Sequence, residues 1–205
     1  MVKDSPCTIF IIDDDASIRH SLARLLNSHG YRTETFTSAE EFLDRMPYEG
    51  FGCFLLDMEL DGLDGLELQQ VLLANKSLLP IIFISGKGSI STSVSALRAG
   101  ALTFLEKPVE ESVLMPMIRE ALRVSEHRAL EDACQKEASI LFESLSPREM
   151  EVFKLVTSGL LNKQIAGELN IAEHTVKLHR QRITTKLGVK SVAEIIQLGQ
   201  AAGLI

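Results

Sequence analysis

The chain has 205 residues, of which 45% are hydrophobic and 24% charged, a composition typical of a folded globular protein. This composition excludes disordered and collagen-like chains, and no apolar run reaches the roughly 18 residues that span a bilayer. The start, MVKDSPCTIF, lacks a basic region followed by an apolar stretch, so we expect a cytoplasmic protein with no membrane contact. Cys7, Cys53 and Cys134 are odd in number and widely spaced, which predicts packed free thiols.

Charge is distributed unevenly along the chain. The formal net charge is −7, but residues 146–205 hold eight Lys and Arg against five Asp and Glu, whereas residues 1–125 hold 11 against 18. Binding to nucleic acid depends on the field of one surface rather than on the total charge. The C-terminal third therefore remains a candidate for nucleic-acid binding in an acidic protein.

Apolar segments suited to buried strands alternate with helical patterns in the first 125 residues. We expect strands at 7–12, 31–36, 51–56, 80–85 and 101–106, and amphipathic helices at 16–28, 64–75 and 89–99. The connections are short, which favours parallel strands joined by crossover helices. The predicted fold is a doubly wound α/β domain with a five-stranded parallel sheet covered on both faces.

The rest of the chain reads as helical. Residues 109 to about 145 mix charged residues with Ala, Leu and Ile and contain no Gly, which predicts a helical connector that begins near Pro116 or bends there. Four short helices are expected beyond it, in a small all-α domain without strands. Their signals are a Ser146 cap and a Gly159 stop, an Asn162 cap for 163–169, a Gly188 stop for 173–187, and a Ser191 cap.

Acidic residues and a lysine directly follow the predicted strands. Asp13, Asp14 and Asp15 follow the first strand, Asp57 the third and Lys107 the fifth. In a parallel α/β sheet the carboxyl ends of the strands meet at one edge, so we expect these side chains to converge. Clustered carboxylates repel one another unless a hard divalent cation such as Mg²⁺ binds them, and a lysine can meet a phosphoryl group. For Asp15 alone, a purely structural role is the simpler interpretation.

Four motifs, IFIIDDD, FLLDMELDGLDG, IIFISGKG and TFLEKP, occur in this order between residues 9 and 108. Together they resemble the receiver domain of bacterial two-component response regulators, over about residues 5–125. The resemblance implies a flavodoxin-like fold. It also implies that Asp57 is the phosphoacceptor, Asp14 a direct Mg²⁺ ligand, Asp13 a ligand through water, and the Glu59 backbone carbonyl a further ligand.

The same resemblance implies the parts of a switch. Ser85 would be the switch hydroxyl, Phe104 the rotating aromatic and Lys107 the cation that contacts phosphate, with Lys107-Pro108 as a candidate cis peptide. Phe104 is equally well explained as a core aromatic. Two positions depart from the family pattern: Asp61 stands where Pro is frequent, which predicts a looser loop, and Ser85 stands where Thr is commoner.

The segment LSPREMEVFKLVTSGLLNKQIAGELNIAEHTVKLHRQRITTKLGVKS resembles the LuxR-type helix-turn-helix of the NarL/FixJ regulators, over about residues 144–205. In its third predicted helix, Val176, Ile183 and Leu187 share the face expected to pack on Ile165 and Leu169. The opposite face carries polar residues and one leucine: His174, Lys177, Leu178, Gln181, Arg182 and Thr185.

That opposite face predicts a helix that enters the major groove of DNA. We expect Gln181 to contact adenine, Lys177 to contact guanine and Leu178 to contact a thymine methyl. Contacts to phosphate, which carry no sequence information, are assigned to Lys163, Thr175, Arg180, Arg182 and Lys186. Ala172 stands where Ser often caps this helix in the family, so we expect an uncapped start.

These interpretations predict a transcriptional response regulator rather than an enzyme, with a receiver at 1–125, a helical linker at 126–143 and a helix-turn-helix domain at 144–205. The expected partners are a sensor histidine kinase, double-stranded promoter DNA, a second copy of the chain after phosphorylation and, as a further candidate, RNA polymerase. Dimerisation is assigned to the surface of residues 89–122, where Arg98, Glu106 and Arg119 could form ion pairs.

Two other functions stay open at this point. The first is a Mg²⁺-dependent phosphotransferase or phosphatase of haloacid-dehalogenase type, although such an enzyme would require Asp rather than Glu59 two residues after its nucleophile. The second is a DNA-binding regulator whose receiver is not phosphorylated. The presence of Asp13, Asp14, Asp57, Ser85 and Lys107 disfavours it.

Overall fold

The computed structural model describes residues 7–48, 50–86 and 90–205, and gives the backbone alone for 90–93. The chain divides into two compact units, Met1–Leu130 and Glu131–Ile205. The start of the helix predicted at 89–99 lies outside the described residues. Within the described ranges, no helix is both long and apolar enough to cross a membrane.

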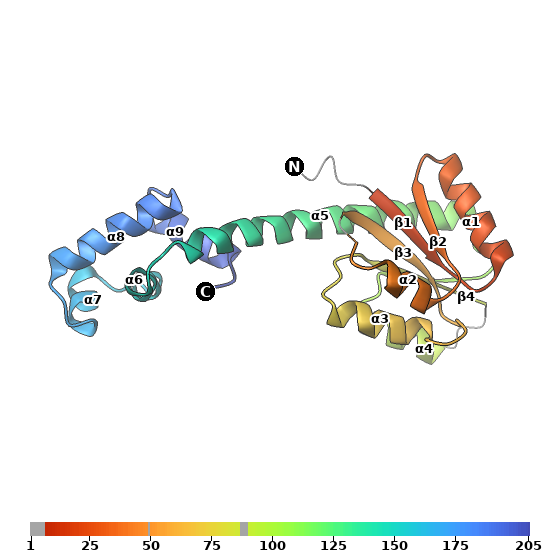
Figure 1. The fold of residues 1–205 in the computed structure, drawn as a ribbon, viewed down its shortest axis with the longest axis horizontal. Coiled ribbons are helices and arrows are strands. Elements are labelled where there is room, and N and C mark those ends of the chain that lie inside the picture. The colour runs from red at the N-terminus through yellow and green to blue at the C-terminus, as the bar shows by residue number, and fades with distance from the viewer. Residues whose placement is uncertain (1–6, 49, 87–89) are drawn as a thin grey trace. The chain divides into compact units, whose positions relative to one another are not determined.

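A parallel sheet forms the centre of the first unit (Figure 1). Its strands are β1 (Cys7–Ile12), β2 (Arg32–Phe36), β3 (Phe51–Asp57), β4 (Ile81–Ser85) and β5 (Thr103–Glu106). They lie in the order β2-β1-β3-β4-β5, and every neighbouring pair is parallel. The predicted fold class is therefore confirmed, and the carboxyl ends of the strands meet at one edge of the sheet.

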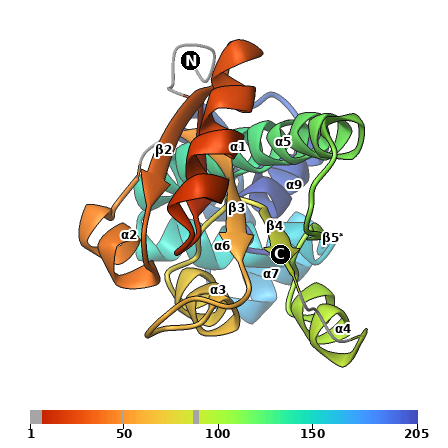
Figure 2. The ribbon, with the colours of Figure 1, turned by 90° about the vertical axis from the view of Figure 1, so that its right-hand side faces the viewer.

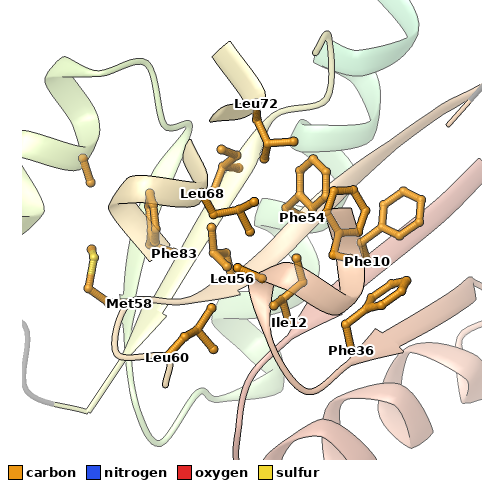
Figure 3. Close-up of a cluster of buried hydrophobic side chains, with 14 residues drawn as sticks. Phe10, Ile12, Phe36, Phe54, Leu56, Met58, Leu60, Leu68, Leu72 and Phe83 are labelled. Atoms are coloured by element: carbon orange, nitrogen blue, oxygen red, sulfur yellow. The ribbon is translucent and has the colours of Figure 1, made fainter. Parts of the chain in front are cut away.

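Helices cover both faces of this sheet (Figure 2). Helices α1 (Ala16–Ser28) and α5 (Glu111–Glu143) cover one face, and α2 (Ala39–Arg45), α3 (Gly65–Ala74) and α4 (Ile90–Arg98) cover the other. Side chains alternate along a strand, so Ile9 and Ile11 pack beneath α1 and α5 while Phe10 and Ile12 belong to the opposite core. Figure 3 shows that opposite core, in which Phe54 also lies.

Three local features differ from the sequence analysis or refine it. Helix α2 is not among the helices that the sequence patterns predict, because it has seven residues and buries two of them, Ala39 and Phe42. Helix α5 begins at Glu111, so Pro116 lies inside it but near its start. Cys53 is buried as expected, whereas Cys134 is exposed on α5, so the prediction of a packed thiol is wrong there.

The second unit contains the C-terminal part of α5 and four further helices. These are α6 (Pro147–Thr157), α7 (Asn162–Glu168), α8 (Glu173–Leu187) and α9 (Val192–Ala201). Ser146 caps α6 in a capping box, and Gly188 ends α8 with φ +67°. Ser191 caps α9 as predicted, and Ala172 leaves α8 without a side-chain cap.

The Asn162 cap is a wrong prediction. The N-cap position of α7 is Leu161, whose backbone N–H donates to Gln164 Oε1 at 2.8 Å. The Asn162 side chain instead accepts a hydrogen bond from Arg180 Nη1 of α8 at 2.8 Å. A tertiary partner thus replaces the local role that the sequence indicated.

Two glycines should respond to alanine in opposite ways. Gly52 lies in β3, where a Cβ would come within 1.9 Å of the Thr8 carbonyl oxygen, whereas a Cβ at Gly167 in α7 would meet nothing within 4 Å. We expect Gly52→Ala to lower the free energy of unfolding of the first unit by about 1–3 kcal/mol or more, because β1 and β3 must separate. Gly167→Ala should stabilise the second unit by about 0.4–1 kcal/mol.

Urea unfolding checks this pair of variants. Both tyrosines, Tyr31 and Tyr48, lie in the first unit and the chain has no Trp, so tyrosine fluorescence follows that unit alone. Far-UV circular dichroism follows both units. An unchanged fluorescence midpoint in Gly52→Ala would contradict the close approach of the two strands.

Candidate functional site

The residues that follow three strands of the sheet do converge. Lys107, after β5, donates from Nζ to Asp13 Oδ2 at 2.7 Å and to Asp57 Oδ2 at 2.8 Å. Asp13 follows β1 and is 2% exposed, and Asp57 ends β3 and is 5% exposed. Residues 94 positions apart in the chain are thus joined by one ammonium group.

Burial and hydrogen bonding set the charges of this cluster. Burial raises the pKa of the Asp13 carboxyl, although the hydrogen bonds from Lys107 and from the Asp15 backbone oppose the rise. Burial by itself would lower the pKa of Lys107, but its bonds to Asp13 and Asp57 outweigh that effect and raise it. Lys107 therefore stays protonated, and the site holds two buried carboxylates against one fixed positive charge.

A third carboxylate completes an oxygen-rich site. Asp14 is exposed, and one ligand atom each from Asp13, Asp14 and Asp57 lies within 4.8 Å of the others. Carboxylate oxygens at this spacing suit a hard divalent cation. Asp15 does not belong to the group: its side chain accepts from the backbone of Ser17 and caps α1, in agreement with the structural interpretation.

The loop after Asp57 begins with a hydrogen bond to the side chain of Asp57 itself. The backbone N–H of Glu59 donates to Asp57 Oδ1 at 3.3 Å, and the Glu59 side chain is exposed. Glu59 can therefore offer its backbone, but not a buried carboxylate, to the site. The role of the Glu59 carbonyl as a metal ligand stays a prediction.

The two switch candidates lie beside the cluster. Ser85 ends β4 and is fully buried, and its carbonyl accepts from the Lys107 backbone N–H at 2.8 Å. Phe104 pairs with Phe83 in the β4–β5 ladder and is partly buried against the core under α2, α3 and α4. The Lys107-Pro108 peptide is cis, as predicted.

Helix α8 has the two faces that its sequence predicted. Val176, Ile183 and Leu187 are buried with Ile165 in the core of the second unit, and Leu169 packs against them. The opposite face is exposed, and it carries His174, Lys177, Leu178, Gln181, Arg182 and Thr185. Leu178 is 44% exposed, which places an apolar group in solvent between Lys177 and Gln181.

The five residues assigned to phosphate fall into two groups. Lys163 and Arg182 are exposed and Thr175 is half-buried, so all three remain near the surface. Arg180 is tied to Asn162, and Lys186 donates to Glu149 Oε2 at 2.7 Å and to the Ser144 carbonyl at 2.9 Å.

Arg180 and Lys186 therefore help to assemble the unit. The partner of Lys186 is a buried carboxylate, Glu149, which sits 37 residues away and also closes the capping box of α6. The sequence indicates the Ser146 cap but carries no signal of the ion pair, because the pair depends on how α6 and α8 pack.

Family models match both parts of the chain. Residues 9–119 match the model described as the response regulator receiver domain, and residues 143–198 match that of bacterial regulatory proteins of the luxR family. The first match includes the Asp13, Asp57 and Lys107 cluster. The second includes all of α6, α7 and α8.

Individual proteins are similar over nearly the whole chain. The transcriptional regulatory protein FixJ of Bradyrhizobium diazoefficiens is 39% identical over 197 residues, which cover 96% of each chain. The response regulator protein TmoT of Ectopseudomonas mendocina is 40% identical over 198 residues, covering 96% of this chain and 90% of that protein. The solved structure of the response regulator StyR is similar with a TM-score of 0.81, at 44% identity, covering 96% and 99% of the two chains.

The Glu149–Lys186 pair should make the second unit sensitive to acid. The hydrogen bonds from Lys186 and from the Ser146 backbone lower the pKa of Glu149 to about 2. A folded-state pKa below the unfolded value stabilises the fold above the unfolded pKa, and this stability is lost as the pH falls toward about 2. Glu149→Gln should therefore lower the free energy of unfolding at pH 7 by about 1–3 kcal/mol, with a difference that shrinks below about pH 4.5.

Urea unfolding followed by the NMR amide signals of α6 and α8 measures this difference. Glu151→Gln is the matched control, because Glu151 lies on the same helix but is exposed and pairs with Arg148 one turn away. A Glu149→Gln effect that stays constant between pH 7 and pH 3 would contradict the assignment.

Proposed function

The chain belongs to the response regulators that join a receiver domain to a LuxR-type DNA-binding domain, and we propose that Asp57 is the residue through which a sensor histidine kinase controls it. Regulators of this kind couple phosphorylation to transcription. Its relatives are transcriptional regulators, so the phosphatase alternative is set aside. We keep the proposed boundaries of 1–125, 126–143 and 144–205, and propose that the protein acts in the cytoplasm.

The bridge from Lys107 to Asp13 and Asp57 carries this proposal. Asp57 is the buried carboxylate at the centre of the strand edge, and it has a fixed cation at 2.8 Å. In the transfer, an Asp57 carboxylate oxygen forms a bond to phosphorus while the phosphorus–nitrogen bond to the kinase histidine breaks. The electron pair of that bond stays with the imidazole. Lys107 meets the charge on the phosphoryl oxygens, which favours a regulated receiver over a silent one.

Asp13, Asp14 and Asp57 are the side chains that would hold Mg²⁺, with the Glu59 carbonyl as a further ligand. The oxygen-only donor set fits this ion. When bound, Mg²⁺ neutralises charge on the phosphoryl oxygens. We propose that Asp14 binds the ion directly and that Asp13 binds it through water.

Phosphorylation would reach the surface of the receiver through Ser85 and Phe104. Ser85 is buried at the end of β4, from where its hydroxyl can follow new phosphoryl oxygens, and Phe104 is only partly buried, which leaves it room to turn inward. Phe104 packs on the core that contains Ala96 of α4. We propose that the surface of α4, β5 and the start of α5 then pairs with a second copy of the chain.

That surface offers apolar contact and charge together. Leu97 and Val113 are 45% and 47% exposed, and Arg98, Glu106 and Arg119 are exposed on the same three elements. Exposed ion pairs contribute under about 1 kcal/mol each, so they would set the register while the apolar groups supply affinity. A dimer can present two helix-turn-helix units to two half-sites of DNA.

For promoter DNA, we propose that α8 enters the major groove with Lys177, Leu178 and Gln181 at the base edges. Lys163, Thr175 and Arg182 would contact phosphate. Arg180 and Lys186 would also contact phosphate, while they are bound to Asn162 and Glu149. RNA polymerase remains a proposed partner of the DNA-bound protein.

Asp57→Asn should abolish phosphorylation by a small phosphodonor with Mg²⁺. Asp13 is also buried and bonded to Lys107, but Asp57 is the carboxylate that ends β3, the central strand of the sheet. Intact-mass spectrometry after incubation measures the incorporated phosphoryl group. Asp61→Asn is the control: Asp61 is exposed on the loop after β3 and should keep full labelling. Full labelling of Asp57→Asn would remove Asp57 from its role.

Base-reading and phosphate-contacting residues should differ in how they depend on sequence and salt. We expect Lys177→Ala and Gln181→Ala each to lose about 1–3 kcal/mol of discrimination between selected and random DNA. Arg182→Ala should weaken binding to both about equally and lower the salt slope by about one. Titrations at several salt concentrations, with a site selected from a random library, decide this. Equal losses on both DNAs for all three variants would mean that another face reads the bases.

A further inference from the structure

The loop between β3 and α3, residues 58–64, must keep a defined shape if the Glu59 carbonyl is to serve a cation. Its ends are tied to the sheet: Met58 donates from its backbone N–H to the Ile84 carbonyl at 3.1 Å, and Gly65 donates to the Met58 carbonyl at 3.2 Å. On the inner side, Leu60 is buried and Leu63 packs on the same core. The outer side of the loop needs a separate contact.

Glu40 of α2 supplies that contact from outside the loop. Its Oε1 accepts a hydrogen bond from the Leu63 backbone N–H at 2.9 Å, across 23 residues of sequence. The carboxylate also lies against the Cα of Gly62, where a Cβ would come within 2.7 Å of Glu40 Oε1. Gly62 has φ +84°, a backbone conformation that favours glycine.

The neighbouring Glu41 shows that this contact is specific to one of two adjacent acids. Glu41 Oε2 accepts from the backbone N–H of Thr37 at 2.6 Å and from its hydroxyl at 2.8 Å, so it acts within the start of α2. Both side chains sit in the first turn of this helix and both are exposed. Of the two, Glu40 is the one that reaches the loop.

We propose that Glu40 is a positioning residue for the phosphorylation site, which holds the loop after Asp57 in the shape that presents the Glu59 carbonyl to the metal. The inference rests on the proposed function, since that function supplies the metal. Its physical content is a charge-assisted hydrogen bond that restrains a loop lacking a proline at Asp61. The pKa of Glu40 is lowered by its own backbone N–H and by that of Leu63, so the carboxylate is ionised at neutral pH.

Two readouts test this role in the full-length protein. The first is MgCl₂ titration followed by amide chemical shifts, and the second is hydrogen–deuterium exchange of residues 58–64 without metal. Glu40→Ala should raise the dissociation constant for Mg²⁺ about three- to tenfold, the effect of one net hydrogen bond, and should speed exchange in the loop. The rate of phosphorylation at saturating Mg²⁺ should change by less than about twofold.

Two matched variants separate the hydrogen bond from charge. Glu40→Gln keeps an oxygen that can accept from Leu63 and should keep Mg²⁺ affinity within about twofold of the native protein. Glu41→Ala removes the same charge from the same turn and should leave both readouts unchanged.

The outcomes that overturn the proposal are distinct. Native affinity and native loop exchange in Glu40→Ala would exclude it, and so would equal losses in Glu40→Ala and Glu41→Ala, which would indicate a general effect of charge. Failure of the native protein to bind Mg²⁺ would instead refute the metal site of the proposed function and, with it, the metal-binding part of this inference.

Discussion

One ammonium group between two buried carboxylates organises the receiver. Lys107 joins the end of β5 to the ends of β1 and β3 through Asp13 and Asp57, at 2.7 and 2.8 Å. Without it, two carboxylates in a poorly hydrated site would repel each other and one would take up a proton. With it, Asp57 can stay buried in a position that a phosphoryl donor can approach. A phosphoryl group on Asp57 would therefore add negative charge directly beside Lys107 and Asp13.

The strands around this cluster explain how a local change can reach the surface. Ser85 and Phe104 lie on β4 and β5, the strands that follow the Asp57 strand β3 in the sheet order, and both are held in the parallel ladder. The Ser85 carbonyl and the Lys107 backbone are joined directly. In the proposed switch, a shift of Lys107 toward a phosphoryl group would pull on the strand end that carries Ser85, and the partly buried Phe104 would respond next.

The DNA-binding unit uses basic residues for two different purposes. Lys177 and Arg182 face solvent on α8, whereas Arg180 and Lys186, on the same helix, bind Asn162 and Glu149. These two pairs connect α8 to α7 and α6. A helix that reads bases in a groove of DNA must be held at a fixed angle to the rest of its domain. These two side-chain pairs help to fix that angle. Net charge alone would count all four as candidates for the DNA backbone.

The sequence by itself determined the parts that follow from short-range rules. Strand alternation gave the five-stranded sheet, strand ends gave Asp13, Asp57 and Lys107, and the period of 3.6 residues gave the two faces of α8. The caps at Ser146 and Ser191 and the stop at Gly188 were equally local. In each case the signal depends only on neighbouring residues or on the common edge of a parallel sheet.

Only the tertiary structure decided which polar side chains meet across helices. The sequence indicated Asn162 as a cap because nothing nearby in the sequence shows Arg180, and it carried no sign that Lys186 also pairs with Glu149, 37 residues away. The link from Glu40 to Leu63 and the exposure of Cys134 were hidden for the same reason. Such contacts depend on the separation and rotation of packed helices to within the length of a hydrogen bond, and no pattern along a single segment carries that information.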